Sequence, residues 1–266
     1  MHLQVLISTM NKKGNELISK MRIDSDAVVV NQCNQTNTET FQKNNSHIKW
    51  IDSLDRGLSR SRNLALKNAT SEICLLSDDD LEYIDGYEKL ITSQFEKFPE
   101  ADIITFQVEG VEEVFKEYSS KVSKLNYLTS MKVASVEIAF RLESINRAGI
   151  NFNESFGAGS KYLMGEENIF LFNCLKHNLK IIYVPLKIAN LHVSESTWFR
   201  GFNKDYFISK GAVFTEMSRL LSYLFILQFA IRKYKLYKDE LTRLQAVKYM
   251  LKGRRQFLRE RMQVNI

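Results

Sequence analysis

The chain has 266 residues, of which 44% are hydrophobic and 26% charged, enough for one large domain or for one domain with an appendage. Its net charge of +6 is uneven, because residues 232–266 carry eleven Lys or Arg against three acidic residues, a net +8, and the first 231 residues carry −2. No motif of base-stacking aromatics accompanies the basic residues, which argues against a nucleic-acid binder and for a basic tail on a near-neutral body.

The three cysteines, Cys33, Cys74 and Cys174, are odd in number and far apart, so they suggest neither a disulfide framework nor a thiolate zinc site. We expect them to be buried and reduced. The apolar run at the N-terminus is too short for a signal peptide. The most hydrophobic stretch, residues 220–231, is well short of the ~20 residues that cross a bilayer. We therefore expect a cytoplasmic protein without a transmembrane span.

In the first half of the chain, short apolar runs alternate with longer, helix-compatible stretches. The expected strands are residues 3–8, 27–30, 48–51, 72–76 and 102–107, and the expected helices are residues 12–21, 58–68 and 86–98. Residues 32–46 form a polar stretch without an expected element. The alternation is typical of βα units, so we predict an α/β fold with a Rossmann-like, mostly parallel central sheet.

The second half is less regular. Residues 109–126 are polar, residues 136–141 and 180–184 are expected strands, and a Gly-containing loop at residues 156–160 precedes a helix that opens at Gly165. From about residue 207 the pattern is helical, with a predicted apolar stripe of Leu241, Leu244, Val247, Leu251 and Leu258. This pattern predicts a long helix or a helical pair. We therefore divide the chain into a domain over residues 1–206 and a C-terminal amphipathic, basic helical region over residues 207–266.

Three adjacent carboxylates, Asp78, Asp79 and Asp80, follow the fourth expected strand. Such neighbours resist ionising together unless a cation compensates them. Mg²⁺ and Mn²⁺ prefer oxygen ligands, and Mg²⁺ typically binds one or two carboxylates plus substrate phosphates. Ligands of open α/β sheets bind at the carboxyl ends of strands, where this triplet lies. The alternative is a solvated acidic cluster at the start of the next helix, and the triplet alone leaves both interpretations open.

Residues 57–63, Gly-Leu-Ser-Arg-Ser-Arg-Asn, with the apolar strand and the triplet that follow, resemble the family-2 glycosyltransferases of the GT-A fold. Those proteins show a Gly-x-Ser-x-Ala-Arg-Asn helix, an apolar strand and an Asp-x-Asp motif. The resemblance implies a Mn²⁺ or Mg²⁺ ion that bridges the diphosphate of a nucleotide-sugar, with Asp78, Asp79 and Asp80 as candidate ligands. Ser77 stands where the family commonly has a carboxylate, which shifts the expected contact toward Asp79 or Asp80.

The resemblance also implies a set of contacts to the nucleotide-sugar. The candidate residues are Ser8, Thr9, Met10, Asn31, Gln32, Arg62, Asp78 and Asp79. Asn31 and Gln32 replace an acidic residue that the family often has, and their amides can pair with a uracil edge or a ribose hydroxyl. Arg62 and Arg200 are candidates to bind phosphate oxygens. His192 is a candidate metal ligand, although a lone histidine in a loop is equally well a structural residue.

An inverting transfer needs a carboxylate that deprotonates the acceptor hydroxyl. Glu166 and Glu167 follow the glycine-containing loop, and this arrangement resembles the family's acceptor loop and acidic pair. By that match Glu167 is the first candidate for the base and Glu166 the second. The alternative is that both glutamates only complement the dipole of the helix that they open.

The sequence thus predicts an inverting glycosyltransferase that moves a hexose or N-acetylhexosamine from a UDP-sugar to a glycan or lipid-linked oligosaccharide in bacterial surface polysaccharide or capsule synthesis. Two other classes stay open. One is a non-catalytic glycan-binding protein on the same fold. The other is a phosphotransferase of the haloacid-dehalogenase type, although its Asp-x-Asp motif ends the first strand, whereas here three expected strands precede the one that ends in the triplet.

The basic C-terminal region has two interpretations. It is a solvated helix packed on the body, or it lies on an anionic membrane as a peripheral anchor. In the second case the enzyme works at the inner face of the plasma membrane, and the expected interfacial groups are Trp198, Phe199, Phe202, Tyr223, Phe225 and Phe229. The sequence leaves the sugar, the linkage and the oligomeric state open, a homodimer included.

Overall fold

The computed structural model describes residues 1–43, 45–192 and 201–264, and the chain divides into two compact units. The first unit comprises Met1–Arg56, Arg60–Phe152 and Phe170–Ser196, and the second comprises Gly57–Ser59, Asn153–Ile169 and Thr197–Ile266. Each unit is described by itself below. The domain boundary expected between residues 206 and 207 stays a prediction.

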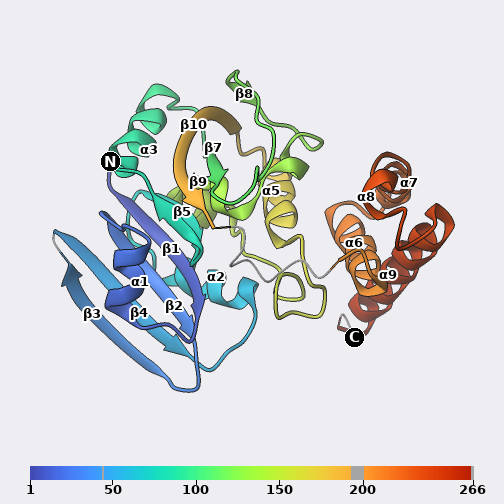
Figure 1. Cartoon of the computed structure of the whole chain (residues 1–266), viewed down its shortest axis with the longest axis horizontal. Coiled ribbons are helices and arrows are strands. Elements are labelled where there is room, and N and C mark those ends of the chain that lie inside the picture. The colour runs from blue at the N-terminus through green and yellow to red at the C-terminus, as the bar shows by residue number, and fades with distance from the viewer. Residues whose placement is uncertain (44, 193–200, 265–266) are drawn as a thin grey trace. The chain divides into compact units, whose positions relative to one another are not determined.

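A mixed sheet forms the centre of the first unit (Figure 1). Its strands are β1 (Leu3–Met10), β2 (Asp26–Gln32), β3 (Asn37–Lys43), β4 (Ser46–Ser53), β5 (Ile73–Asp78), β6 (Leu81–Tyr83), β7 (Ile103–Gly110), β8 (Ser123–Lys124), β9 (Ile138–Arg141) and β10 (Ile181–Leu191). Their order is β3-β4-β2-β1-β5-β9-β7-β10-β6, and β8 pairs with β10. Strands β4, β2, β1 and β5 are parallel neighbours, as are β7 and β10, which confirms the predicted α/β class with its parallel core.

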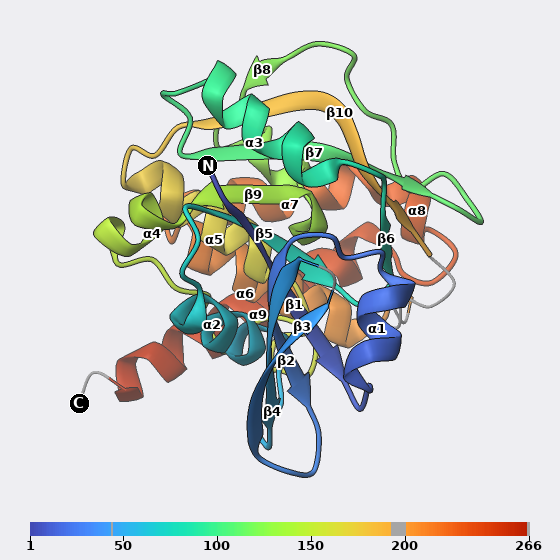
Figure 2. The same cartoon turned by 90° about the vertical axis from the view of Figure 1, so that its left-hand side faces the viewer.

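Helices cover both faces of this sheet, which Figure 2 shows with strands β1 to β4 in front. The helices are α1 (Gly14–Lys20), α2 (Leu58–Asn68), α3 (Tyr87–Lys97), α4 (Leu142–Ala148) and α5 (Glu166–Lys176). Side chains of α1 and α3 share one apolar core with Val5 and Ile7 of β1, and side chains of α2, α4 and α5 share a second core with Leu6. Successive residues of β1 therefore enter opposite cores, as the alternation of a strand requires.

Strand β3 is an element that the sequence did not predict. It lies within the polar stretch 32–46 and pairs antiparallel with β4, from Asn37 opposite Asp52 to Lys43 opposite Ser46. Most of its residues are exposed, because it is the outermost strand and needs no apolar face. The acidic triplet consequently follows the fifth strand rather than the fourth, and β5 continues through Ser77 and ends at Asp78 instead of stopping at residue 76.

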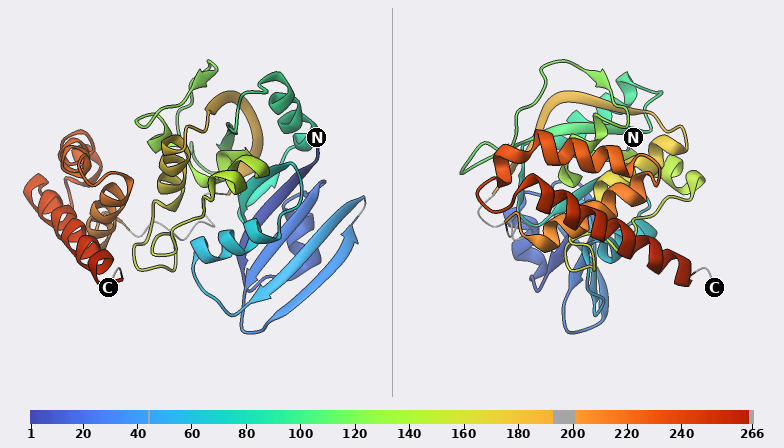
Figure 3. Two further views of the ribbon diagram at one scale, coloured as in Figure 1. Left: turned by 180° about the vertical axis from the view of Figure 1, so that it is seen from behind. Right: turned by 90° about the vertical axis from the view of Figure 1, so that its right-hand side faces the viewer.

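The helical C-terminal region is confirmed as helical, but it is neither one helix nor a pair. The described residues of the second unit form α6 (Lys204–Met217), α7 (Ser222–Arg232), α8 (Tyr234–Tyr237) and α9 (Arg243–Val264), which the right panel of Figure 3 shows in orange and red. The buried residues of α9 are Ala246, Met250, Gly253 and Phe257. Of the predicted stripe, Leu244 is 83% exposed and does not pack, whereas the other four residues, Leu241, Val247, Leu251 and Leu258, are partly buried.

The expected interfacial aromatics are corrected in part. Phe225 is buried, and both Phe225 and Phe229 pack against Phe214 with ring centroids 5.8 and 6.0 Å apart, so these two rings belong to the helical core. Tyr223 is exposed as expected. Trp198 and Phe199 lie outside the described residues.

Two glycines allow α6 and α9 to cross closely within the second unit. A Cβ atom built on Gly253 would lie 1.9 Å from the carbonyl oxygen of Ile208, and one built on Gly211 would lie 1.9 Å from that of Met250. No real Cβ approaches an oxygen so closely, so an alanine at either position forces the helices apart. The crossing therefore depends on both glycines.

We expect Gly253→Ala to lower the free energy of unfolding by at least about 2 kcal/mol, even though alanine is the better helix former by about 1 kcal/mol. Chemical denaturation of the full chain measures the change. Lys252→Ala, at an exposed neighbouring position of α9, is the matched control and should change stability by less than about 0.5 kcal/mol. Equal stability of the Gly253 variant and the wild type would show that the helices do not meet here.

All three cysteines are buried and unpaired, as expected. Within the described residues, no helix combines the length and the apolar character that crossing a bilayer requires.

Candidate active site

Polar side chains predicted to bind the donor, together with Asp52, form a row across the carboxyl ends of four parallel strands in the first unit. Ser8 of β1 pairs in register with Asp78 of β5, and Thr9 pairs with Asn31 of β2. Asn31 in turn pairs with Asp52 of β4. The structure thus brings together residues that lie up to 70 positions apart in sequence, at the edge where open α/β sheets bind ligands.

The first two carboxylates of the triplet already contact hydrogen-bond donors and cations. Arg62, buried beneath them, donates from Nη2 to both oxygens of Asp78, at 3.0 and 3.2 Å. Thr9 donates to Oδ2 of Asp79 at 2.5 Å, and Nζ of Lys12 lies 3.9 Å from the same oxygen. Lys12 was not among the predicted residues. Only its position just beyond the end of the first strand could have indicated it.

Asp80 and His192 lie together. The backbone N–H of His192, the first residue after β10, donates to the carbonyl oxygen of Asp80 at 2.9 Å. The ring of His192 stands between two further carboxylates, with Nε2 3.7 Å from Glu82 and Nδ1 3.3 Å from Glu112. The last residue of the triplet and the predicted histidine are therefore in backbone contact, although 112 positions separate them in the sequence.

Residues in both halves of the motif over residues 57–63 form hydrogen bonds with other parts of the chain. In the second unit, Gly57 has φ +120°, Leu58 N donates to Ala158 O, and Ser59 Oγ donates to Phe156 O. The start of the motif thus holds the glycine-containing loop at residues 156–160.

In the first unit, the rest of the motif contacts the strand ends and a neighbouring turn. Ser61 hydrogen-bonds Ser8 at 2.9 Å, Arg62 pairs with Asp78, and Asn63 exchanges two hydrogen bonds with the backbone of Phe152. The residue types that carry the resemblance are therefore those that fix the loop and the carboxylate.

Asp52 is a buried carboxylate at the end of β4 that sequence reasoning missed. It accepts hydrogen bonds from Asn31 at 2.8 Å, from Trp50 at 2.9 Å and from Gln35 at 2.5 Å. Burial alone would raise the pKa of Asp52, but these donors outweigh it and hold the pKa below its usual value, so the group is a carboxylate at neutral pH. An aspartate directly after an expected strand was the available signal.

The remaining predicted donor residues lie beside this network. Asn31 also accepts from Lys12 N at 3.0 Å and donates to Lys12 O at 3.2 Å, which ties the ends of β1 and β2 together. Gln32 is buried next to it, whereas Met10 is half exposed at the end of β1.

Glu166 and Glu167 belong to the second unit, where both stand at the start of α5, as predicted. Glu166 is buried, and its carboxylate packs on Gly157, where a Cβ atom would lie 3.2 Å from it. Glu167 is only partly buried.

Lys210 of α6 interacts electrostatically with Glu167. Burial lowers the pKa of Lys210, and the negative charge of Glu167 acts in the opposite direction. The ammonium group also lies over the rings of Phe214 and Phe229, at 5.5 and 5.6 Å from their centroids. A cation therefore accompanies the carboxylate of Glu167 and favours its ionised form.

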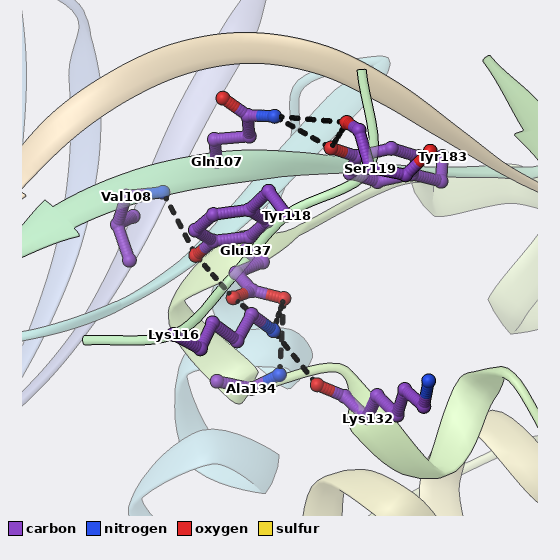
Figure 4. A network of polar contacts seen from close by, with 9 residues as sticks. All are labelled: Gln107, Val108, Lys116, Tyr118, Ser119, Lys132, Ala134, Glu137 and Tyr183. Atoms are coloured by element: carbon purple, nitrogen blue, oxygen red, sulfur yellow. Dashed lines mark hydrogen bonds and ion pairs between the residues drawn. The ribbon is translucent and has the colours of Figure 1, made fainter. Parts of the chain in front are cut away.

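A buried glutamate anchors the polar segment that follows β7 (Figure 4). Glu137 accepts from Lys116 Nζ at 2.5 Å and from Tyr118 OH at 2.7 Å, and burial raises its pKa although the positive charge of Lys116 opposes this. Gln107 donates to Tyr183, whose hydroxyl donates to Ser119 O. The segment expected to be irregular is thus irregular but fixed to the sheet by side chains.

The structure does not describe one of the predicted phosphate-binding residues, and the predicted metal ligands within the described residues form no closed site. Arg200 and residues 193–198 of the stretch after β10 lie outside the described residues. Over residues 1–43, 45–192 and 201–264, no group of three or more His, Cys, Asp or Glu side chains is arranged to hold a metal ion by itself.

Comparison with known families gives one match over just over half of the chain. The family described as glycosyl transferase family 2 matches residues 17–156, which include the motif at residues 57–63 and the acidic triplet. No curated protein matches this chain in sequence.

Solved structures of TarS from S. aureus have a similar fold. TarS 1-349 in complex with UDP-GlcNAc superposes with a TM-score of 0.67 at 15% identity, over 95% of this chain and 81% of that one. The same protein in complex with UDP gives 0.63 at 16% identity, over 91% and 76%. A longer TarS structure gives 0.64 at 16% identity, and the match covers 91% of this chain but only 46% of that one. At these identities the likeness shows the fold alone.

Proposed function

Because the chain belongs to glycosyl transferase family 2, we propose that it transfers a hexose or N-acetylhexosamine from a UDP-sugar to a glycan or lipid-linked oligosaccharide, with inversion at the anomeric carbon. The observation that carries this proposal is the row of polar side chains at the carboxyl ends of β5, β1, β2 and β4. A nucleotide-sugar presents a base, a ribose and a diphosphate in line. The row offers amides and a carboxylate at one end and the acidic triplet at the other.

We assign the base and ribose to the side of the row where Asn31 and Asp52 lie. The side-chain amide of Asn31 can donate and accept, and the carboxylate of Asp52 fixes its orientation. The TarS structures that contain UDP and UDP-GlcNAc show that a protein of this fold binds such donors, and they motivate the choice of a UDP-sugar here.

We assign the diphosphate, with Mn²⁺ or Mg²⁺, to the triplet. The donor set fits such an ion, because carboxylate oxygens suit both metals and the backbone of Asp80 is hydrogen-bonded to that of His192, whose imidazole is a further candidate ligand. A site without a closed cage also fits, since Mg²⁺ usually keeps several waters and completes its shell with substrate phosphates. The metal would neutralise charge as the nucleoside diphosphate leaves. Asp78 and Asp79 are retained as further candidate ligands, and Lys12 is placed to contact a phosphate oxygen.

We assign the general base to Glu167. Its partial exposure leaves the carboxylate accessible to an acceptor, and the electrostatic interaction with Lys210 favours its ionised form. Glu166 is the second choice, because it is buried against Gly157.

We further propose that the acceptor belongs to a bacterial surface polysaccharide such as a capsule, and that transfer takes place in the cytoplasm at the inner face of the plasma membrane. Carboxylates are present both at the proposed metal site and at the proposed general base, which favours a transferase over a non-catalytic glycan-binding protein. The position of the triplet after the fifth strand speaks against the phosphotransferase alternative, in which the first strand carries the nucleophile.

Titration calorimetry of the full chain with UDP, GDP and UDP-GlcNAc, each with and without Mn²⁺, tests the donor assignment. We expect binding of the two uridine nucleotides that strengthens at least about tenfold with Mn²⁺, since the ion bridges the triplet and the diphosphate. Preference for GDP would overturn the base assignment, and metal-independent binding would overturn the metal assignment.

Asp52→Asn is expected to weaken UDP binding by about tenfold, equivalent to about 1.4 kcal/mol, with a smaller effect on kcat. The substitution removes the negative charge and replaces one of the two oxygens that accept from Asn31, Trp50 and Gln35 by an NH2 donor, which disturbs the orientation of Asn31, so the loss should appear in Kd and KM. Asp26→Asn is the matched control, because Asp26 also accepts a backbone hydrogen bond, from His47, but lies at the opposite end of β2. An equal loss in both variants would mean that Asp52 acts only through stability.

A further inference from the structure

Helix α7 leaves a large apolar surface in solvent. Phe225, Ile226 and Ala230 are buried, whereas the other side of the helix is open. The surface, called the α7 face, consists of Leu220, Tyr223, Leu224, Leu227 and Ile231, each between 52% and 88% exposed. At 100° per residue, its four helical members fall within an arc of about 100°, so they form one continuous strip. Exposed apolar strips of this kind mark interaction sites.

The charged residues of the segment that carries the α7 face all have one sign. Residues 217–238 contain no Asp or Glu. They contain five basic residues, all exposed, namely Arg219, Arg232, Lys233, Lys235 and Lys238. In addition, the guanidinium of Arg254 lies 4.1 Å from the ring centroid of Tyr223, at the edge of the strip. The surface is thus apolar at its centre and cationic at its rim.

We propose that the α7 face docks on an anionic lipid bilayer. An apolar strip with a basic rim matches both layers of such a surface, because the leucines reach the acyl boundary while Lys and Arg contact lipid phosphates. The 11 residues of α7 are too few to span a bilayer, which takes about 20, so the helix lies along the interface. We thus place the contact with the bilayer at α7 and its flanks rather than at the apolar residues of α9.

A second copy of the chain fits this surface less well. A two-fold interface would bring the same patch of both copies together and face the basic rim of one with the basic rim of the other. Like charges across an interface are costly, and no acidic residue of the segment relieves them. The charge pattern therefore favours a bilayer that carries negative charge.

Vesicle flotation with the full chain tests the proposal. We expect binding to vesicles of equal parts phosphatidylcholine and phosphatidylglycerol, little binding to phosphatidylcholine alone, and weakening as salt rises. The double variant Leu224→Asp/Leu227→Asp should reduce the bound fraction at least about tenfold, because both side chains leave the acyl boundary. Leu244→Asp is the matched control, since Leu244 is also exposed, at 83%, but lies on α9, and should bind like the wild type.

Each of several outcomes would overturn the proposal: no binding of the wild type to the anionic vesicles, an equal loss with Leu244→Asp, or a change of mass in solution caused by the double variant, which would reveal a protein interface. A second variant, Lys235→Glu/Lys238→Glu, tests the rim without touching the apolar strip and should lose binding to anionic vesicles only. Thermal unfolding of every variant serves as the folding control, and UDP binding is measured beside it. The UDP measurement separates this proposal from the donor assignment, since either can fail alone.

Discussion

Replacing Glu167 by glutamine is expected to lower kcat of sugar transfer by about 10²- to 10⁴-fold while the affinity for UDP stays unchanged. The amide keeps the size of the side chain but cannot accept the proton that leaves the acceptor hydroxyl. Lys210, whose positive charge favours the ionised carboxylate, is then left without its negative neighbour. Steady-state kinetics of transfer, together with calorimetry of UDP binding, separates this chemical loss from a loss of donor binding.

Two variants of the same unit serve as controls for Glu167→Gln. Glu154→Gln changes an exposed carboxylate nearby in sequence and should leave kcat within about twofold of the wild type. Glu166→Gln should mainly reduce stability, because the Glu166 carboxylate is buried on Gly157. If Glu166→Gln abolishes transfer while Glu167→Gln keeps more than about a tenth of it, the base is Glu166.

The sequence predicted which residues meet at the carboxyl ends of the strands, because local rules determine that arrangement. An apolar run that ends in three carboxylates places them at the end of a strand, and parallel strands bring their ends to one edge. Ser8, Thr9 and Asn31 meet there for the same reason. The structure adds why Arg62 is needed, since the buried guanidinium balances Asp78 beneath the surface.

Features that depend on long-range packing were missed. Strand β3 carries no apolar alternation, and only its pairing with β4 makes it a strand. The sequence did not single out Asp52, and only the structure shows that its carboxylate accepts a hydrogen bond from Asn31. The large leucines of α9 suggested a stripe, but the helix packs on Ala246 and Gly253 because small residues permit the close crossing with α6.

Sequence and structure together narrow the choice of metal ligand within the triplet. The sequence offered three candidate carboxylates and shifted the expected metal contact toward Asp79 or Asp80. In the structure, Asp78 is engaged by Arg62 and Asp79 by Thr9 and Lys12, whereas Asp80 meets His192 through the backbone. Within the proposed function, we propose a division of roles, in which Asp78 and Asp79 organise the strand end and Asp80 with His192 contacts the metal.

On this division, Asp80→Asn is expected to lower kcat/KM for transfer by about 10²- to 10³-fold and to make UDP binding insensitive to Mn²⁺. Asp78→Asn should instead lower stability, because the buried Arg62 loses its carboxylate partner. Asp85→Asn, at an exposed aspartate paired with Arg22, is the control and should behave like the wild type. Calorimetry with and without Mn²⁺ and thermal unfolding distinguish the three. If Asp80→Asn keeps the metal effect and Asp79→Asn removes it, the ion is held by Asp79, and the contact between Asp80 and His192 is structural.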